Sequence, residues 1–220
     1  MCLLSYYPSS KSGDGPVLTS NRDISIRRPT ADSIKEYEYK GKTVAFPRDY
    51  KGGSWMAYDR SRMIFLLNGH KINHHSRDNY ARSRGLVLLD LFIAPDVLAT
   101  WESSFDLDGI EPFTIVYVTA DGLYELGWDE NRKYTTSLST KEAHMWMSST
   151  LYTEEDKQRI QKEFQNIKNP TSMDLMDFNE KNNYAAIKLP IDKIEVVETV
   201  CTYQLLKAEN RIRHLELIHQ

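Results

Sequence analysis

The first 26 residues read MCLLSYYPSSKSGDGPVLTSNRDISI. Residues 2–7 are mostly apolar and aromatic, residues 8–15 are rich in Ser, Gly and Pro, and residues 16–26 alternate between apolar and polar types. An apolar stretch and an alternating stretch joined by turn-forming residues are typical of a β-hairpin. The pattern therefore predicts that the chain begins with two antiparallel strands.

Groups of strands and groups of helices follow each other along the rest of the chain. The expected strands cover residues 54–59, 63–68, 113–119, 123–129, 194–208 and 211–218, and the expected helices cover 86–92, 95–101, a segment that begins near Thr153, and 172–179. Thr153 precedes three acidic residues, which favours a capped helix start. Because single strands do not alternate with single helices, an α+β fold with antiparallel sheets is favoured over a doubly wound parallel sheet.

The composition excludes several classes of protein. Lys and Arg number 28 against 31 Asp and Glu, so the net charge is 28 − 31 = −3, which argues against a nucleic-acid binder. Two cysteines are too few for a disulfide scaffold or a Cys-rich zinc module. No apolar run approaches the roughly 20 residues of a transmembrane helix, and early polar residues argue against a signal peptide. We expect one cytoplasmic domain over residues 1–220.

Cys2 is the first candidate for chemistry. Met1 is normally removed before a small residue, which would leave Cys2 at the mature N-terminus. A terminal cysteine carries a nucleophilic thiol (ordinary pKa about 8.5) and an α-amine (about 7.7–8.0) that can take up the thiol proton. The alternative is that Cys2 is an inert residue at the start of a core strand.

Two polar groups near the expected hairpins are further candidates. Asn21, Arg22 and Asp23 interrupt an apolar stretch, and a carboxylate there would hold an N-terminal ammonium while Arg would favour a thiolate. Asn68 ends an apolar strand, and its amide could donate to a developing oxyanion. The alternatives are a solvent-facing turn for residues 20–23 and an ordinary Asn-Gly turn for residues 68–69.

These pieces together resemble a known family. The opening Met-Cys, Asn-Arg-Asp at 21–23, Gly-Gly-Ser-Trp at 52–55, Asn68 and Ser-Arg-Gly at 83–85 look like the Asn-Arg-Asp-Glu family, also called the transport and Golgi organisation protein 2 family. That family is in turn similar to the N-terminal-nucleophile hydrolases, especially the penicillin V acylase and bile salt hydrolase branch. The resemblance implies a four-layer αββα sandwich of two antiparallel sheets.

The resemblance also implies roles for individual residues. Cys2 would be the nucleophile, Asp23 would contact its amine, Arg22 would support the site electrostatically and Asn68 would donate to the oxyanion. The expected substrate is a small molecule with a linear amide (C–N) bond, which is cleaved through a Cys2 acyl-enzyme without a cofactor or a metal. The expected binding residues are Asn21, Trp55 and Ser149.

Three positions depart from the family pattern. Ile24 replaces the final Glu of the family motif, Ser149 stands where an oxyanion-hole Asn is expected, and Thr199 stands where the family has an Arg. These changes favour the alternative function, a non-catalytic ligand-binding or trafficking protein that uses the same pocket. The resemblance implies haem or a lipid-related molecule as its ligand. The sequence leaves the substrate and the oligomeric state open.

The remaining candidates are weaker. His70, His74 and His75 lie in one polar segment, and His70 and His74 would share a face if that segment were helical, as zinc ligands can. A solvated loop is the favoured interpretation, because no Glu follows His70. Cys201 lies in a long expected strand and is expected to be a core residue.

Overall fold

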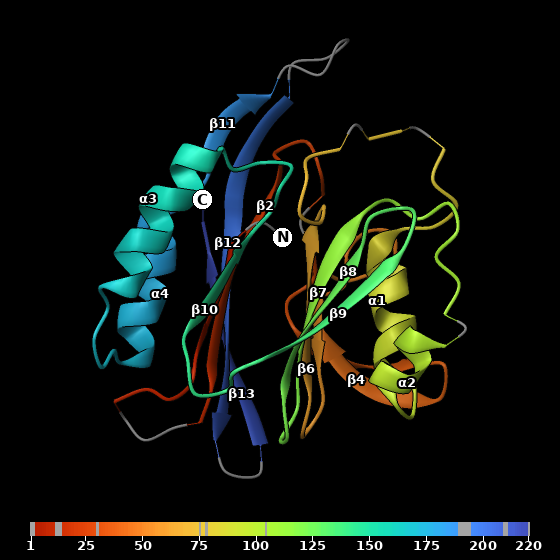
Figure 1. Cartoon of the computed structure of the whole chain (residues 1–220), viewed down its shortest axis with the longest axis horizontal. Helices are drawn as coiled ribbons and strands as arrows, with labels where there is room; N and C mark the ends of the chain where they lie inside the picture. Colours follow the sequence, from red (N-terminus) through yellow and green to blue (C-terminus); the bar gives the residue numbers. More distant parts are fainter. Residues whose placement is uncertain are drawn as a thin grey trace. The chain divides into compact units, whose positions relative to one another are not determined.

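Two antiparallel sheets, each with its own helices, make up the chain. The computed structural model describes residues 3–11, 15–29, 31–74, 76–77, 79–103, 105–188, 195–208 and 211–219. Two compact units are formed, one from residues 1–29 and 140–220 and the other from residues 30–139 (Figure 1). Every strand pairing between described residues is antiparallel. The predicted α+β class is therefore confirmed.

The sheet of the first unit joins the beginning of the chain to its end. Its order is β10-β1-β2-β12-β11, and β13 also pairs with β12. The bounds are β1 Leu3–Tyr7, β2 Val17–Ser25, β10 His144–Met147, β11 Ala185–Lys188, β12 Glu195–Ala208 and β13 Arg211–Ile218. β1 pairs with β2 from Leu3 opposite Asn21 to Tyr7 opposite Val17, which confirms the predicted hairpin. β12 pairs with the other edge of β2.

Two helices, α3 (Glu154–Gln165) and α4 (Ser172–Lys181), lie side by side along this sheet (Figure 1). Thr153 caps α3 as predicted, since its side chain accepts a hydrogen bond from the Asp156 backbone. A reciprocal capping box, which the sequence reading missed, begins α4 at Thr171. The Phe164 and Phe178 rings pack 5.4 Å apart and join the two helices in one apolar cluster. The cluster fixes α4 against the sheet at the level of β2.

The second unit is one longer sheet with a pair of helices. Its strand order follows the sequence, β3-β4-β5-β6-β7-β8-β9. The bounds are β3 Lys35–Tyr39, β4 Lys42–Phe46, β5 Met56–Tyr58, β6 Met63–Asn68, β7 Phe113–Val118, β8 Leu123–Trp128, β9 Lys133–Leu138, α1 Arg84–Phe92 and α2 Val97–Glu102. Neighbours in this sheet are consecutive in the chain, and the connection from β6 to β7 contains α1 and α2.

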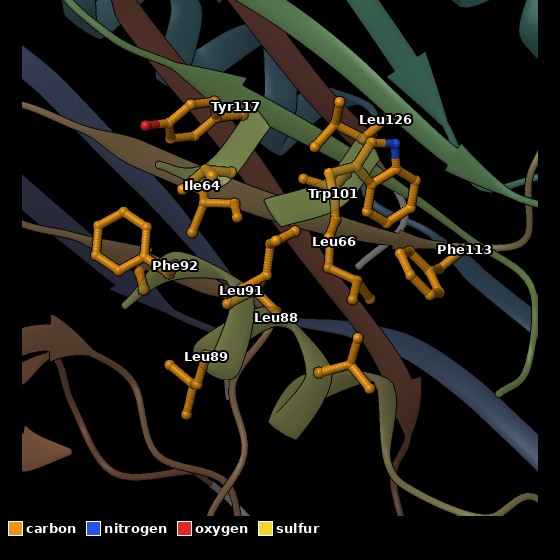
Figure 2. Packing of buried hydrophobic residues seen from close by; sticks show 14 of the residues in the cluster. Ile64, Leu66, Leu88, Leu89, Leu91, Phe92, Trp101, Phe113, Tyr117 and Leu126 are labelled. Carbon is orange, nitrogen blue, oxygen red and sulfur yellow. The ribbon is translucent and has the colours of Figure 1, made fainter. Parts of the chain in front are cut away.

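Helix α1 supplies the apolar face that packs on this second sheet. Figure 2 shows Leu88, Leu91 and Phe92 of α1 close to Ile64 and Leu66 of β6, all of them buried. Trp101 of α2 and Phe113 of β7 extend the same cluster. β6 is buried along almost its whole length, which confirms the prediction of a central strand that is apolar on both faces.

The strands that the sequence reading missed share one property. They are β3, β4, β9, β10 and β11, and each lies at a sheet edge or next to one. The edge strand Lys133–Leu138 is largely exposed, so its sequence carries few apolar residues in alternation. Apolar alternation is a weak indication of a strand where one face and one edge are exposed to solvent.

None of the helices in the described part of the chain has the length and apolarity needed to cross a bilayer.

Candidate functional site

Asp23 is the best-defined charged group of the first unit. It lies on β2, and only 2% of its surface is exposed. The Tyr152 hydroxyl donates to Asp23 Oδ2 over 3.0 Å, and the Thr199 hydroxyl donates to Asp23 Oδ1 over 2.5 Å. Hydrogen bonds to an ionised acceptor are short and strong, so both carboxylate oxygens are held in a fixed orientation.

A bulge in β12 brings Thr199 to this carboxylate. Thr199 is opposite Asp23 and Cys201 is opposite Arg22, so Val200 is an extra residue on one strand. In a regular pairing Val200 would be opposite Asp23 when Cys201 is opposite Arg22. The extra residue places Thr199 opposite Asp23 instead, so that both side chains lie on the same face of the sheet. The Thr199 hydroxyl also accepts the Tyr184 backbone N–H over 2.7 Å. This contact ties Asp23 to the segment that leads into β11.

Asn21 has a structural environment that the sequence reading did not foresee. Its Nδ2 donates to the backbone oxygen of Asn179 on α4 over 2.9 Å, and its Oδ1 accepts from Asn179 Nδ2 and from the Thr202 hydroxyl. Ser5 on β1 donates to Asn179 Oδ1 over 3.1 Å. These side chains are completely or almost completely buried, so they form a polar layer between the sheet and α4. Asn21 therefore joins β2 to α4.

Arg22 lies on the opposite face of β2, because side chains alternate along a strand. It is opposite Cys201 of β12, and its positive charge offsets a small part of the rise that burial causes in the pKa values of Cys201 and Tyr203. Burial outweighs that effect and raises the pKa of the Cys201 thiol to about 11, with Glu216 adding to the rise. The Asn-Arg-Asp motif thus directs Asn21 and Asp23 to one face and Arg22 to the other.

Cys201 is consequently expected to be chemically inert in the folded protein. With a pKa of about 11, roughly one thiol in a thousand is ionised at pH 8, and only the thiolate is alkylated. We expect iodoacetamide at pH 8 to leave Cys201 unmodified over a time in which free cysteine reacts completely, and to modify it after unfolding in urea. Peptide mass spectrometry measures both reactions. Rapid modification of Cys201 in the folded state would contradict this description of its surroundings.

Leu3, the first described residue, lies between two neighbouring strands. Leu3 pairs with Asn21 on one side and with Met147 of β10 on the other. Ser148 and Ser149 follow Met147 directly, and both are buried. Cys2, the candidate nucleophile, lies outside the described residues. The residue that follows it in the chain, Leu3, is therefore flanked by the Asn-Arg-Asp strand and by the segment that contains Ser149.

Asn68 and Trp55 belong to the second unit. Asn68 is the last residue of β6, is half-buried and pairs with Phe113. Trp55 is buried, and its backbone oxygen accepts the Leu66 N–H over 2.8 Å. The first unit thus brings Asn21 and Asp23 together on one strand face, whereas Asn68 and Trp55 are placed only within the second unit.

Two of the short motifs have a packing role in the second unit. A Cβ atom on Gly85 would lie 2.8 Å from the Ser54 backbone oxygen, and one on Gly53 would lie 3.0 Å from the Gly85 backbone. Any side chain at these positions would force the two segments apart. The Ser54 N–H donates to the Gly85 oxygen over 3.3 Å. Gly-Gly-Ser-Trp and Ser-Arg-Gly therefore join the start of α1 to the loop before β5.

The interpretation of the histidine segment as a solvated loop is wrong for His70. Its ring is buried, because Gly127 leaves room for it on β8 and Tyr134 packs against it at 4.8 Å. Burial lowers the pKa of His70. His74 contacts Glu111 at 3.1 Å, and His75 lies outside the described residues. Among the described residues, no group of three or more His, Cys, Asp or Glu is arranged to hold a metal ion.

A comparison with family profiles decides the family. The profile described as "Transport and Golgi organisation 2" matches residues 1–195. The chain belongs to this family. The match includes β1, β2 and the Asn-Arg-Asp motif, together with α3, α4 and β11, but it ends before all of β13 and nearly all of β12. The family that the short motifs indicated is thereby confirmed.

Solved structures show the fold of this family member. A crystal structure of the C2A mutant of a conjugated bile acid hydrolase from Clostridium perfringens superposes with a TM-score of 0.56. The match covers 99% of this chain and 92% of that chain at 7% sequence identity. Such a low identity establishes likeness of fold alone, and that fold is N-terminal-nucleophile hydrolase-like. A search of curated protein sequences found no match.

Proposed function

We propose that this family member is an N-terminal-cysteine hydrolase that cleaves a linear amide bond in a small molecule. The observation that supports the proposal is the buried Asp23 carboxylate, both of whose oxygens accept hydroxyl hydrogen bonds. It lies on the strand that pairs with the first strand of the chain. A carboxylate held close to the first strand is suited to orienting the α-amine of an N-terminal cysteine. That amine would then serve as the base that takes up the thiol proton.

The proposed reaction proceeds in two steps. The α-amine of Cys2 takes the thiol proton, and the sulfur attacks the amide carbon, so that an S–C bond forms. The C–N bond then breaks, and the proton passes from the α-amine to the leaving amine. Water subsequently attacks the thioester, releases the carboxylic acid and restores the Cys2 thiol. In this proposal Asp23 orients the amine and Arg22 supports the thiolate.

A pre-steady-state assay tests this proposal. Mixing the protein with a panel of acyl-amide substrates that release a chromophoric amine should give a burst of amine that matches the concentration of protein. The burst reports the acyl-enzyme, and the slower phase reports its hydrolysis. Absence of both a burst and turnover across linear amides of varied acyl length would contradict the proposal.

Thr199 provides a graded test of the role of Asp23. Thr199→Val keeps the shape of the side chain but removes the hydroxyl that donates to Asp23. A hydrogen bond to a charged group contributes about 1.5–3 kcal/mol, so we expect the rate of acylation to fall by about 10-fold or more with little change in KM. The burst rate measures this effect. Thr136→Val, on the exposed face of β9, is the matched control and should leave the rate unchanged.

A binding function without catalysis is the second candidate. The observation that favours it is Ser149, which is buried beside the start of β1 and whose side chain is a hydroxyl in place of the amide expected for an oxyanion donor. In this case haem or a lipid-related molecule would occupy the pocket. A haem titration followed by absorbance distinguishes the candidates. Saturable binding without any acylation of Cys2 would support the binding function, whereas a substrate burst would exclude a purely non-catalytic role.

A further inference from the structure

The outer edge of β13 is open in the described part of the chain. β13 pairs with β12 from Ile218 opposite Cys201 to Arg211 opposite Ala208. No described strand pairs with its other edge. An open edge presents a row of backbone N–H and C=O groups that can form hydrogen bonds with a further strand.

This edge lacks several of the features that usually prevent pairing with another chain. It is eight residues long, and residues 211–218 contain neither proline nor lysine. Leu215 and Ile218 are large apolar residues, and 44% and 59% of their surfaces are exposed. Natural edge strands are commonly short, or protected by charged side chains, proline or a bulge, and of these β13 has only the charged side chains of Arg211, Arg213 and Glu216. The length of the strand and its exposed apolar residues indicate that a further strand pairs with this edge.

Symmetry restricts how two copies of β13 can pair. In an antiparallel pair related by a two-fold axis, opposite residues must lie on the same face, so one residue must face its own copy. If that residue is Leu215, His214 is opposite the partner's Glu216 and Ile212 is opposite the partner's Ile218. Both contacts occur twice because of the symmetry, and on the other face Arg213 is opposite the partner's Leu217. Opposite charges and apolar residues directly across the two strands stabilise a sheet.

The neighbouring symmetric register is less complementary. If His214 faced its own copy, Ile212 would be opposite the partner's Glu216, so this isoleucine in each copy would meet a carboxylate. Leu215 would then be opposite the partner's Arg213, and two imidazoles would meet at the centre. The sequence RIRHLELI is therefore self-complementary about Leu215 in a way that it is not about His214.

We propose that two copies of this chain associate through β13, paired antiparallel with Leu215 opposite the partner's Leu215. The two first-unit sheets then become one continuous sheet across the dimer. β13 lies outside residues 1–195, so the surface belongs to a part of this chain that the family match does not include. The proposal does not depend on the proposed hydrolase activity, because no residue of the dimer surface takes part in that mechanism.

Sedimentation velocity over a range of concentrations tests the association. The protein should approach a mass of 2 × 25.6 = 51.2 kDa at concentrations near 100 µM. Leu215→Lys places two ammonium groups opposite each other and should raise the dissociation constant by about 100-fold or more. Met173→Lys, which adds the same charge at an exposed position of α4, should leave association unchanged. A monomer at every concentration, or a dimer unaffected by Leu215→Lys, would overturn the proposal.

Charge reversal tests the register. Glu216→Lys alone should weaken the dimer about 10-fold, because the introduced ammonium group would face His214 of the second copy in place of a carboxylate. The double variant His214→Glu with Glu216→Lys should restore association, since each introduced carboxylate would again face a positive charge. Restoration is not expected in the register centred on His214, where these two positions do not face each other. Failure of the double variant to restore the dimer would contradict the Leu215 register.

Disulfide trapping gives an independent result for the same register. In a background with Cys2→Ser, Leu215→Cys should form a disulfide dimer on oxidation by diamide, because residue 215 faces its own copy. Arg213→Cys, whose position faces residue 217 of the partner, should remain largely monomeric under the same conditions. Equal trapping at both positions, on non-reducing electrophoresis, would contradict the proposed pairing.

Discussion

Replacing Cys2 by alanine is expected to lower the rate of amide cleavage by at least about 1,000-fold, since the nucleophile of the acyl-enzyme would be lost. Alanine is also a small second residue, so removal of Met1 should be unaffected and the change should be confined to the thiol. The burst and the steady-state rate of amine release are the measurements. The fold should be retained, and a thermal unfolding midpoint close to that of the parent chain would show it.

Cys201→Ala is the matched control for that variant. Cys201 is buried on β12, and its thiol has a pKa of about 11, so it has no role in the proposed chemistry. We expect a small loss of stability and an unchanged burst amplitude. Full activity in Cys2→Ala, or equal losses of activity in the two variants, would show that the thiol of Cys2 is not the nucleophile.

Asn179→Ala is expected to lower the free energy of unfolding by about 3 kcal/mol. The substitution removes hydrogen bonds to Ser5, to the Thr19 oxygen and to Asn21 Oδ1 in a completely buried layer. A buried polar group that loses its partner costs about 1–3 kcal/mol, and more than one group is affected here. Urea unfolding measures the change.

Asn183→Ala is the control for the buried layer. Asn183 is exposed, and its Oδ1 accepts a longer hydrogen bond of 3.4 Å from Asn21 Nδ2. Its loss should cost less than about 1 kcal/mol, because water can replace an exposed partner. Similar losses of stability in the two variants would indicate that the polar layer does not hold α4 against β2.

Much of the fold could be predicted from the sequence. The hairpin at the chain start has turn-forming residues between two strand-like stretches, and the strand at 63–68 and the helix at 86–92 are strongly apolar runs; the structure contains each of them. Edge strands such as Lys133–Leu138 were missed, because an exposed strand needs few apolar residues. The helix predicted at residues 172–179 is α4, Ser172–Lys181, and only its capping box at Thr171 was not predicted.

The surroundings of the candidate site were harder to predict. Asp23 was identified from its motif, but its contacts with Tyr152 and Thr199 join residues more than a hundred positions apart. The contact with Thr199 depends on a bulge, and nothing in the alternation of β12 marks Val200 as the extra residue. Asn21 was expected to bind a ligand, and that expectation stays a prediction. Its amide already bonds to Asn179 and Thr202.

Intact-protein mass spectrometry tests the central claim most directly. The purified chain is measured before mixing with an acyl-amide substrate and again after acid quenching during the burst. The account predicts a starting mass that lacks Met1 and a transient increase equal to the mass of the acyl group, located on Cys2 by peptide mapping. Retention of Met1 in protein that cleaves the substrate would contradict the account, because Cys2 would then have no free α-amine to act as the base.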